Sequence, residues 1–126
     1  MSGENKKKII VVEDDPFLSK AFSLKLSNAG FDIVLVKDGQ EALGVIAKEE
    51  PDMVLLDVML PHKSGFDILT DLKKDEKLSK IPVIMLSTLG QEDEMKRGLS
   101  LGADEYLVKS NIKLEQVVEK INKYLK

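Results

Sequence analysis

The sequence predicts an α/β protein built on a parallel β-sheet, and two observations carry that prediction. First, five short apolar runs alternate along the chain with longer amphipathic stretches, so strand and helix patterns follow one another in series. Second, some runs, such as "IIVV" at residues 9–12, are apolar at every position, as in strands buried on both faces. Five strand–helix units in series imply right-handed crossovers with helices on both faces of the sheet.

The apolar runs are too short for helices, which favours strands. The predicted strands are Ile9–Val12, Ile33–Val36, Met53–Leu56, Val83–Leu86 and Tyr106–Val108. At 126 residues, the natural arrangement of five strands and five helices is the flavodoxin-like doubly wound fold, with strand order 2-1-3-4-5. That fold binds its ligands outside the carboxyl ends of the strands.

The amphipathic stretches carry helix start and stop signals. The predicted helices begin near Asp15, Asp38, Ser64, Gln91 and Leu114. In the first, Asp15 is the expected N-cap, Pro16 occupies the first helical position and Gly30 lies near the end. The second opens with Asp38 and Glu41, a capping-box pair.

The fourth helix, roughly residues 91–100, is expected to be the least firmly held. Met95 and Leu99 are its clear apolar anchors, and Gly98 weakens its interior. A helix with few apolar anchors opens more readily than its neighbours.

Length and composition limit the classes of protein. We expect a disordered lead-in over residues 1–6, with the basic run Lys6 to Lys8 solvated, and one domain over residues 7–126. The net charge of −3 gives no basic surface for nucleic acid or an anionic membrane. Cysteine is absent, and no apolar stretch has the ~18 residues of a membrane span. These features predict a soluble, cytoplasmic protein that contacts neither membrane nor nucleic acid directly.

Polar residues follow four of the five predicted strands. They are Glu13, Asp14 and Asp15 after the first strand, Asp57 after the third, Ser87 and Thr88 after the fourth, and Lys109 after the fifth. Each of these residues has an ordinary explanation when taken alone: Asp15 as a helix cap and the others as solvated strand ends. His62, which follows Pro61, is expected to be an exposed turn residue without a functional role. Because the carboxyl ends of parallel strands share one edge, we expect the separate residues to converge there.

The charges of this predicted cluster indicate a divalent cation. Glu13, Asp14 and Asp57 bring three negative charges, and Lys109 returns one positive charge. Oxygen ligands without His or Cys favour Mg²⁺, which also binds phosphate oxygens. A carboxylate can accept a phosphoryl group, and metal, Lys109 and Ser87 would stabilise the transferred charge.

The motifs "VVEDD", "LLDVMLPHKSG", "PVIMLST" and "GADEYLVK" together resemble the receiver domain of two-component response regulators, of the chemotaxis-Y type, over about residues 7–126. The resemblance implies that Asp57 is the phosphoacceptor, with Ser87 and Lys109 assisting. It implies Mg²⁺ held by Asp57, by Asp14 directly, by Glu13 largely through water and by the backbone carbonyl of Met59. It implies that Tyr106 is an aromatic switch, whose ring points outward in the inactive state and inward in the active state. It also implies that Pro61 and Gly65 shape the loop after the acceptor.

The function implied is a phosphorylation-controlled signalling domain, not an enzyme, although it assists its own phosphotransfer and slow self-dephosphorylation. Its donor would be the phosphohistidine of a sensor histidine kinase, a phosphotransfer protein or a small acyl phosphate. Phosphorylation would switch the surface of the fourth helix, fifth strand and fifth helix toward an output partner. The chain either works alone through protein contacts or is a receiver cut from a larger protein.

Three positions lead to more specific expectations. The family usually has proline after the lysine, in a cis peptide, whereas this chain has Ser110. Because a cis bond before a non-proline residue costs roughly 3–4 kcal/mol, we expect a trans Lys109–Ser110 bond and a rearranged loop. In the family that the sequence resembles, the positions two after the acceptor and two after the hydroxyl residue flank the approach of the hydrolytic water. Here they are Met59 and Leu89, and their apolar side chains predict a slowly decaying phosphorylated state.

Three other functions compete with this interpretation. A nucleotide- or flavin-binding protein would need a glycine- or hydroxyl-rich phosphate loop, whereas "EDDP" is acidic. A metal-dependent aspartyl phosphohydrolase would need a small-molecule pocket and usually a cap domain. A phosphorylation-independent protein-interaction module on the same scaffold would not need the intact acceptor set.

Overall fold

Five parallel strands form one sheet in the order β2-β1-β3-β4-β5, as the sequence predicts. The computed structural model describes residues 6–88 and 91–125. The strands are β1 (Lys8–Val12), β2 (Asp32–Val36), β3 (Met53–Asp57), β4 (Val83–Ser87) and β5 (Glu105–Val108). Each strand is one residue longer than predicted, at one end only, so Asp57 and Ser87 are the last residues of their strands.

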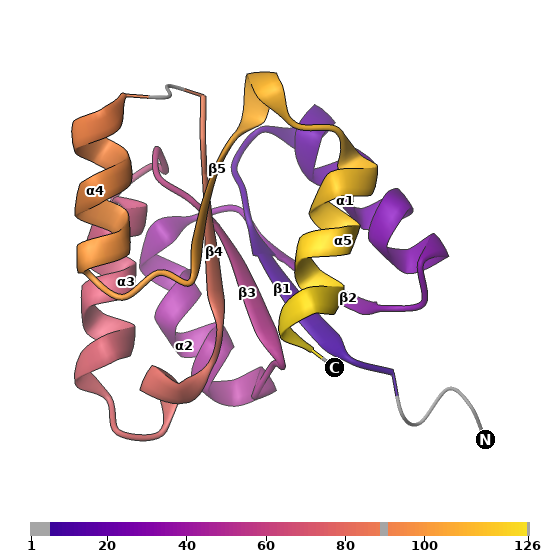
Figure 1. Cartoon of the computed structure of the whole chain (residues 1–126). Coiled ribbons are helices and arrows are strands. Elements are labelled where there is room, and N and C mark those ends of the chain that lie inside the picture. The colour runs from indigo at the N-terminus through magenta and orange to yellow at the C-terminus, as the bar shows by residue number, and fades with distance from the viewer. Residues whose placement is uncertain (1–5, 89–90, 126) are drawn as a thin grey trace.

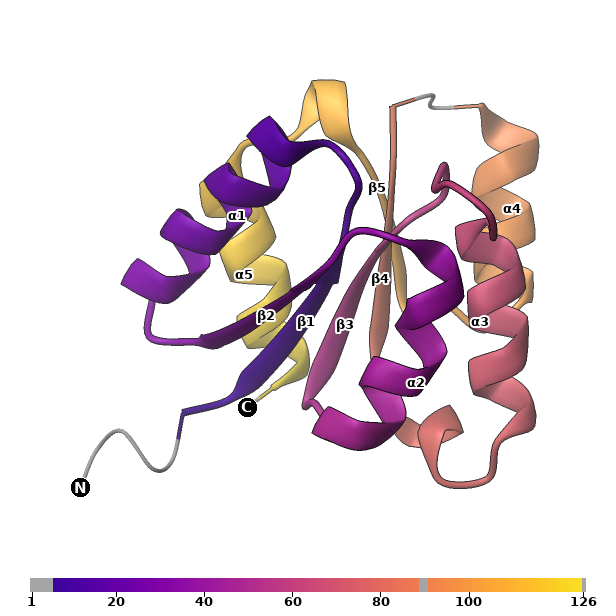
Figure 2. The ribbon, with the colours of Figure 1, turned by 180° about the vertical axis from the view of Figure 1, so that it is seen from behind.

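Helices cover both faces of the sheet. They are α1 (Pro16–Asn28), α2 (Gly39–Glu49), α3 (Gly65–Lys74), α4 (Glu92–Ser100) and α5 (Leu114–Tyr124), with short 3₁₀ turns η2 (Leu78–Lys80) and η3 (Lys109–Asn111). Figure 1 shows α1 and α5 on one side of the strands and α2, α3 and α4 on the other. In the opposite view of Figure 2, α2 and α3 lie toward the viewer. None of the described helices is long and apolar enough to cross a membrane.

The alternation of side chains along the strands builds two cores. Ile10, Val12, Val54 and Leu56 belong to the core on the side of α2 and α3. Ile9, Val11, Met53 and Leu55 belong to the core that includes Phe22 of α1 and Ile121 of α5. Both faces of β1 and β3 are therefore buried, which is why these strands are apolar at every position.

Side-chain caps fix the starts of three helices. The Asp15 carboxylate accepts a hydrogen bond from the Phe17 N–H (2.9 Å), and Pro16 occupies the first turn. The Asp38 carboxylate accepts from the Gln40 N–H (2.9 Å), and Ser64 Oγ accepts from the Asp67 N–H (3.3 Å). The predicted caps Asp15 and Asp38 are confirmed, and Ser64, predicted near the start of the third helix, is its N-cap. The predicted capping-box pair of Asp38 with Glu41 is wrong, because the Asp38 carboxylate accepts from the Gln40 N–H instead.

The basic run differs from the prediction at its last residue. Lys8 belongs to β1, is partly buried and forms an ion pair with Glu49 on α2 (3.0 Å). Its backbone N–H also donates to Asp52 Oδ2 (2.7 Å), ahead of β3. Lys8 is therefore part of the folded domain, whereas most of the predicted disordered lead-in lies outside the described residues.

Candidate functional site

Glu13 and Asp14 follow β1 and differ sharply in exposure. The Glu13 N–H donates to the Val36 carbonyl (2.9 Å), which continues the strand ladder and leaves Glu13 1% exposed. Asp14 is exposed. The next residue, Asp15, caps α1 and donates its N–H to Glu13 Oε2 (3.1 Å), so its role is structural.

Asp57 ends β3 beside β4, buried among apolar strands at 3% exposure. Its partner is Lys109, which begins η3 directly after β5. Lys109 Nζ lies 2.9 Å from Asp57 Oδ2 and 2.6 Å from Glu13 Oε1. The structure thus brings together residues 13, 57 and 109, which are far apart in the sequence. The buried carboxylate that ends "MVLLD" is paired, as a buried charge must be.

The three predicted metal-binding carboxylates converge. One oxygen from each of Glu13, Asp14 and Asp57 lies within 4.8 Å of the others. With Lys109 as the neighbouring cation, the local formal charge is −3 + 1 = −2. An all-oxygen site with two buried carboxylates and one exposed carboxylate fits a hard dication that keeps part of its water shell, as Mg²⁺ does.

Burial and charge shift the proton affinities at this site. Burial raises the pKa of Asp57 to about 6; Lys109 opposes the shift and the neighbouring Glu13 charge adds to it. Burial alone would lower the pKa of Lys109, but its hydrogen bonds to Glu13 and Asp57 outweigh burial and raise that pKa. Lys109 therefore stays charged, while Asp57 takes up a proton at a higher pH than an ordinary aspartate does.

Ser87 and Tyr106 lie on the neighbouring strands β4 and β5. Ser87 is 1% exposed and ends β4. Tyr106 is 6% exposed, so its ring points inward, into the core that contains Met85 and Phe66. Burial raises the pKa of the Tyr106 phenol, and the Ser87 hydroxyl acts in the opposite direction, which places the two side chains near each other.

The loop after Asp57 is held by two glycines with close backbone contacts. A Cβ on Gly65 would lie 2.2 Å from the Asp57 carbonyl oxygen, and a Cβ on Gly39 would lie 2.1 Å from the Lys63 carbonyl oxygen. The Gly65 N–H donates to the Val58 carbonyl (2.8 Å) and the Gly39 N–H to the Pro61 carbonyl (3.3 Å). The loop can lie this close only because both positions lack side chains.

Sequence reasoning missed the contact that His62 makes. His62 has a left-handed backbone (φ 69°), and its Nδ1 lies 2.9 Å from Asp38 Oδ2. This contact joins the loop after Asp57 to the start of α2. His62 is exposed, as expected, but it is not an isolated turn residue; the sequence carries no signal for a pairing across 24 positions.

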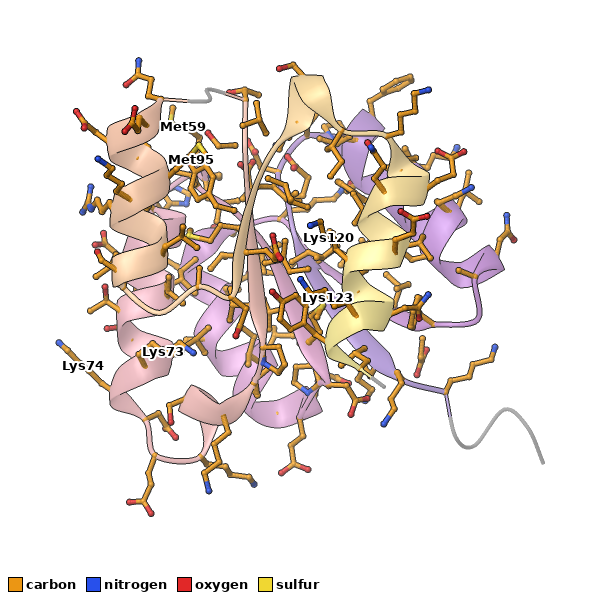
Figure 3. The ribbon with its side chains drawn as sticks, in the orientation of Figure 1. Met59, Lys73, Lys74, Met95, Lys120 and Lys123 are labelled. Carbon is orange, nitrogen blue, oxygen red and sulfur yellow. The ribbon has the colours of Figure 1, made fainter. Side chains whose placement is uncertain are left out.

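Met59 and the loop around it border a hollow of about 480 Å³ beside the acidic cluster. Its walls include Asp14, Val58, Met59, Leu60, Phe66 and Arg97. Met59 is 65% exposed, and its N–H is 3.4 Å from Asp57 Oδ1. Figure 3 shows Met59 and Met95 at the same end of the molecule, beside α4. Leu89, predicted to share the water's approach with Met59, lies outside the described residues.

The segment after Lys109 agrees with the prediction drawn from Ser110. No peptide bond in the described ranges is cis, so the Lys109–Ser110 bond is trans. The chain turns there through η3 before α5 begins at Leu114.

Comparisons with known proteins agree with this geometry. Residues 9–122 match the family model described as the response regulator receiver domain. The chain is 43% identical over 105 residues to a probable transcriptional regulator, ycf27, of Cyanophora paradoxa, covering 83% of this chain and 43% of that protein. The chain spans about two fifths of the length of the curated relatives it matches.

Two solved structures show the same fold. The BeF3-activated N-terminal receiver domain of Klebsiella pneumoniae RstA superposes with a TM-score of 0.88 at 32% identity, covering 94% of this chain and 98% of that one. The Mn(2+)-bound form of the response regulator Rcp1 gives a TM-score of 0.82 at 29% identity, with 95% of each chain covered.

Proposed function

The chain belongs to the family of response regulator receiver domains, and we propose that Asp57 is the residue on which it accepts a phosphoryl group. The observation that carries the proposal is the buried ion pair between Asp57 and Lys109, set beside the carboxylates of Glu13 and Asp14. Phosphorylation-controlled signalling is the function of this family, so the proposal concerns which atoms perform it.

The transfer needs only an attacking oxygen and groups that neutralise charge. An Asp57 Oδ attacks phosphorus, an O–P bond forms, and the P–N bond of a donor phosphohistidine breaks with its electron pair returning to the imidazole. With an acyl phosphate donor, the P–O bond breaks and a carboxylate leaves. Lys109, already within hydrogen-bond distance of Asp57, pairs with the transferred oxygens, and the Ser87 hydroxyl donates to one of them.

A divalent metal fits the donor set. Glu13, Asp14, Asp57 and the backbone carbonyl of Met59 would hold Mg²⁺, with Glu13 acting largely through water. When bound, the ion supplies charge neutralisation for the phosphoryl oxygens. The Mn(2+)-bound form of the response regulator Rcp1 supports the binding of a divalent cation by a domain of this fold.

The output surface in this proposal is α4, β5 and α5. Tyr106 would report the state of Ser87 to that surface, because it lies between the acceptor edge and α4. The donors would be a sensor histidine kinase, a phosphotransfer protein or a small acyl phosphate. The domain would act as a phosphoacceptor, not as a turnover enzyme.

The output itself is a second part of the proposal. The curated relative in Cyanophora paradoxa is named as a transcriptional regulator and is more than twice as long as the matched region, which supports a transcriptional output for a protein that contains this domain. With a net charge of −3, this domain would not contact nucleic acid directly.

Hydrogen exchange after phosphorylation by acetyl phosphate and Mg²⁺ tests the proposal. We expect exchange to change mainly across residues 87–115 in the wild type and to stay unchanged in Asp57→Ala. The same change in Asp57→Ala would overturn Asp57 as the acceptor. A change centred on α1 would overturn the output surface alone.

A further inference from the structure

The ring of Tyr106 lies against α4 at a position that only glycine leaves open. A Cβ built on Gly98 would approach Tyr106 Cδ2 to 2.8 Å and Cε2 to 3.2 Å. Both atoms belong to one edge of the ring, the edge that leads to the phenol oxygen. Gly98, which the sequence alone marks as a weakness of α4, therefore makes room for the inward tyrosine.

Glu94 lies one helical turn before Gly98, on the same face of α4. Residues four apart are neighbours on a helix surface, and helical side chains lean toward the N-terminus. A ring that passes Gly98 along α4 thus meets Glu94 at its hydroxyl end. Electrostatics agree, because the Glu94 charge contributes to raising the pKa of the Tyr106 phenol, after burial as the largest cause.

Two buried side-chain oxygens of α4 and β5 have no hydrogen bond of ordinary geometry among the described residues. They are Glu94 Oε1 and Tyr106 Oη. The Ser87 hydroxyl lowers the pKa of the Tyr106 phenol as a hydrogen-bond donor to it, which leaves the phenol O–H itself available to donate. A buried oxygen without a partner is costly, so each such atom in a folded protein calls for an explanation. One atom is an acceptor and the other can donate, and the charge of Glu94 acts on the Tyr106 phenol, which places the two side chains near each other.

A simpler role for Glu94 is to offset the positive end of the α4 dipole. Glu92 and Asp93 stand in the same first turn, are exposed, and already supply negative charge there. The dipole effect works at the surface and gives no reason to bury a carboxylate oxygen. The location of Glu94 Oε1 is therefore unexplained by the dipole alone.

We propose that Glu94 is the positioning residue for Tyr106: a small side-chain adjustment from the positions seen here lets the phenol O–H donate to Glu94 Oε1, and this hydrogen bond stabilises the inward position of the ring against Gly98. A residue of α4 itself then holds the aromatic side chain in place. The further step, that this bond closes as Ser87 turns toward a phosphoryl group on Asp57, rests on the proposed function.

The chain offers a direct optical test, because it has no tryptophan and only two tyrosines. In a Tyr124→Phe background, Tyr106 is the sole strong fluorophore, and acrylamide quenching measures how far its ring is accessible. The variants are Glu94→Ala, which removes the acceptor, and Glu94→Gln, which keeps an acceptor oxygen without charge. The matched control is Glu92→Ala, which removes a carboxylate from the same turn, one that is 79% exposed and paired with Lys96.

Loss of a hydrogen bond of ordinary net strength should shift the inward–outward equilibrium of Tyr106 by about fivefold. We expect the quenching constant to rise in Glu94→Ala, to stay near the parent value in Glu92→Ala, and to be largely restored in Glu94→Gln. Equal quenching in Glu94→Ala and Glu92→Ala would overturn the proposal, and so would Glu94→Gln behaving like Glu94→Ala. Circular dichroism confirms that each variant is folded.

A second arm adds beryllofluoride and Mg²⁺ to the same proteins. We expect quenching to fall in the parent and to fall less in Glu94→Ala, because the ring then lacks its partner. A fall of equal size in both proteins would overturn the coupling to the acceptor. Failure of beryllofluoride to act on the parent would contradict the proposed function, while the first arm still decides the Glu94–Tyr106 bond.

Discussion

Lys109 Nζ, in the segment that follows β5, lies 2.9 Å from Oδ2 of Asp57, the last residue of β3. The same ammonium group is 2.6 Å from Glu13 Oε1, so one cation holds two buried carboxylates. Two negative charges share one positive charge, and the exposed Asp14 adds a third negative charge nearby. The site is thus incompletely neutralised, and its stability should respond to protons and to metal.

The first prediction concerns pH in metal-free protein. The pKa of Asp57 is raised from 3.8 to about 6 by burial, so the folded state favours its protonated form. This group therefore stabilises the fold below about pH 4, and the contribution is lost as pH rises through about 6. In EDTA, wild type should lose up to about 3 kcal/mol between these values relative to Asp57→Asn, as measured by urea unfolding. Parallel pH profiles for the two proteins would contradict the raised pKa.

The second prediction concerns metal. Mg²⁺ should raise the melting temperature of the wild type, because it binds the folded cluster of Glu13, Asp14 and Asp57 and not the unfolded chain. Asp14→Ala should abolish that rise. Asp15→Asn is the matched control, since it removes the neighbouring charge but keeps the cap on α1, and its melting temperature should still rise. An equal rise in Asp14→Ala would remove Asp14 from the metal site.

The third prediction compares two glycines. Gly65→Ala should destabilise the protein by about 2–3 kcal/mol, because the new Cβ would lie 2.2 Å from the carbonyl oxygen of Asp57 and displace the backbone there. Gly44→Ala, inside α2 with no atom within 4 Å of its Cβ, should stabilise by about 0.5–1 kcal/mol. Chemical denaturation checks both values, and similar stabilities for the two variants would contradict the close contact.

The fourth prediction concerns the lifetime of the phosphorylated state. Met59 is exposed beside Asp57 and cannot orient an attacking water, so the wild type should lose its phosphoryl group slowly. Met59→Asn supplies a hydrogen-bonding group and should speed the decay about tenfold after donor removal. Leu24→Asn, an equally polar change at an exposed position on α1, should leave the decay unchanged. Equal lifetimes in all three proteins would exclude control by Met59.

Much of the site could be predicted because parallel strands place their carboxyl ends at one edge. Asp57, Ser87 and Lys109 end or follow different strands, and strand order alone makes them neighbours. The sequence patterns also located each strand to within one residue of its observed ends. The place of Asp15 directly before Pro16 predicts a helix cap, and the structure confirms that role.

Contacts between loops and helix faces could not be predicted in this way. The His62–Asp38 pair and the tight approach of Gly39 to Lys63 depend on how the loop after β3 folds back onto α2. Nothing periodic in the sequence encodes that geometry. Glu94 looks like any acid in the first turn of a helix, and its buried oxygen is visible only once α4 is packed against Tyr106.

Intact-mass spectrometry with acetyl phosphate tests the central claim, that Asp57 accepts the phosphoryl group, most directly. Wild type with Mg²⁺ should gain the mass of one phosphoryl group, which is lost in EDTA controls and absent in Asp57→Ala. Borohydride reduction before digestion should place the modified residue in the peptide that contains "LLDVML". An unchanged wild-type mass, together with no binding of beryllofluoride, would contradict the account, as would an equal mass gain in Asp57→Ala.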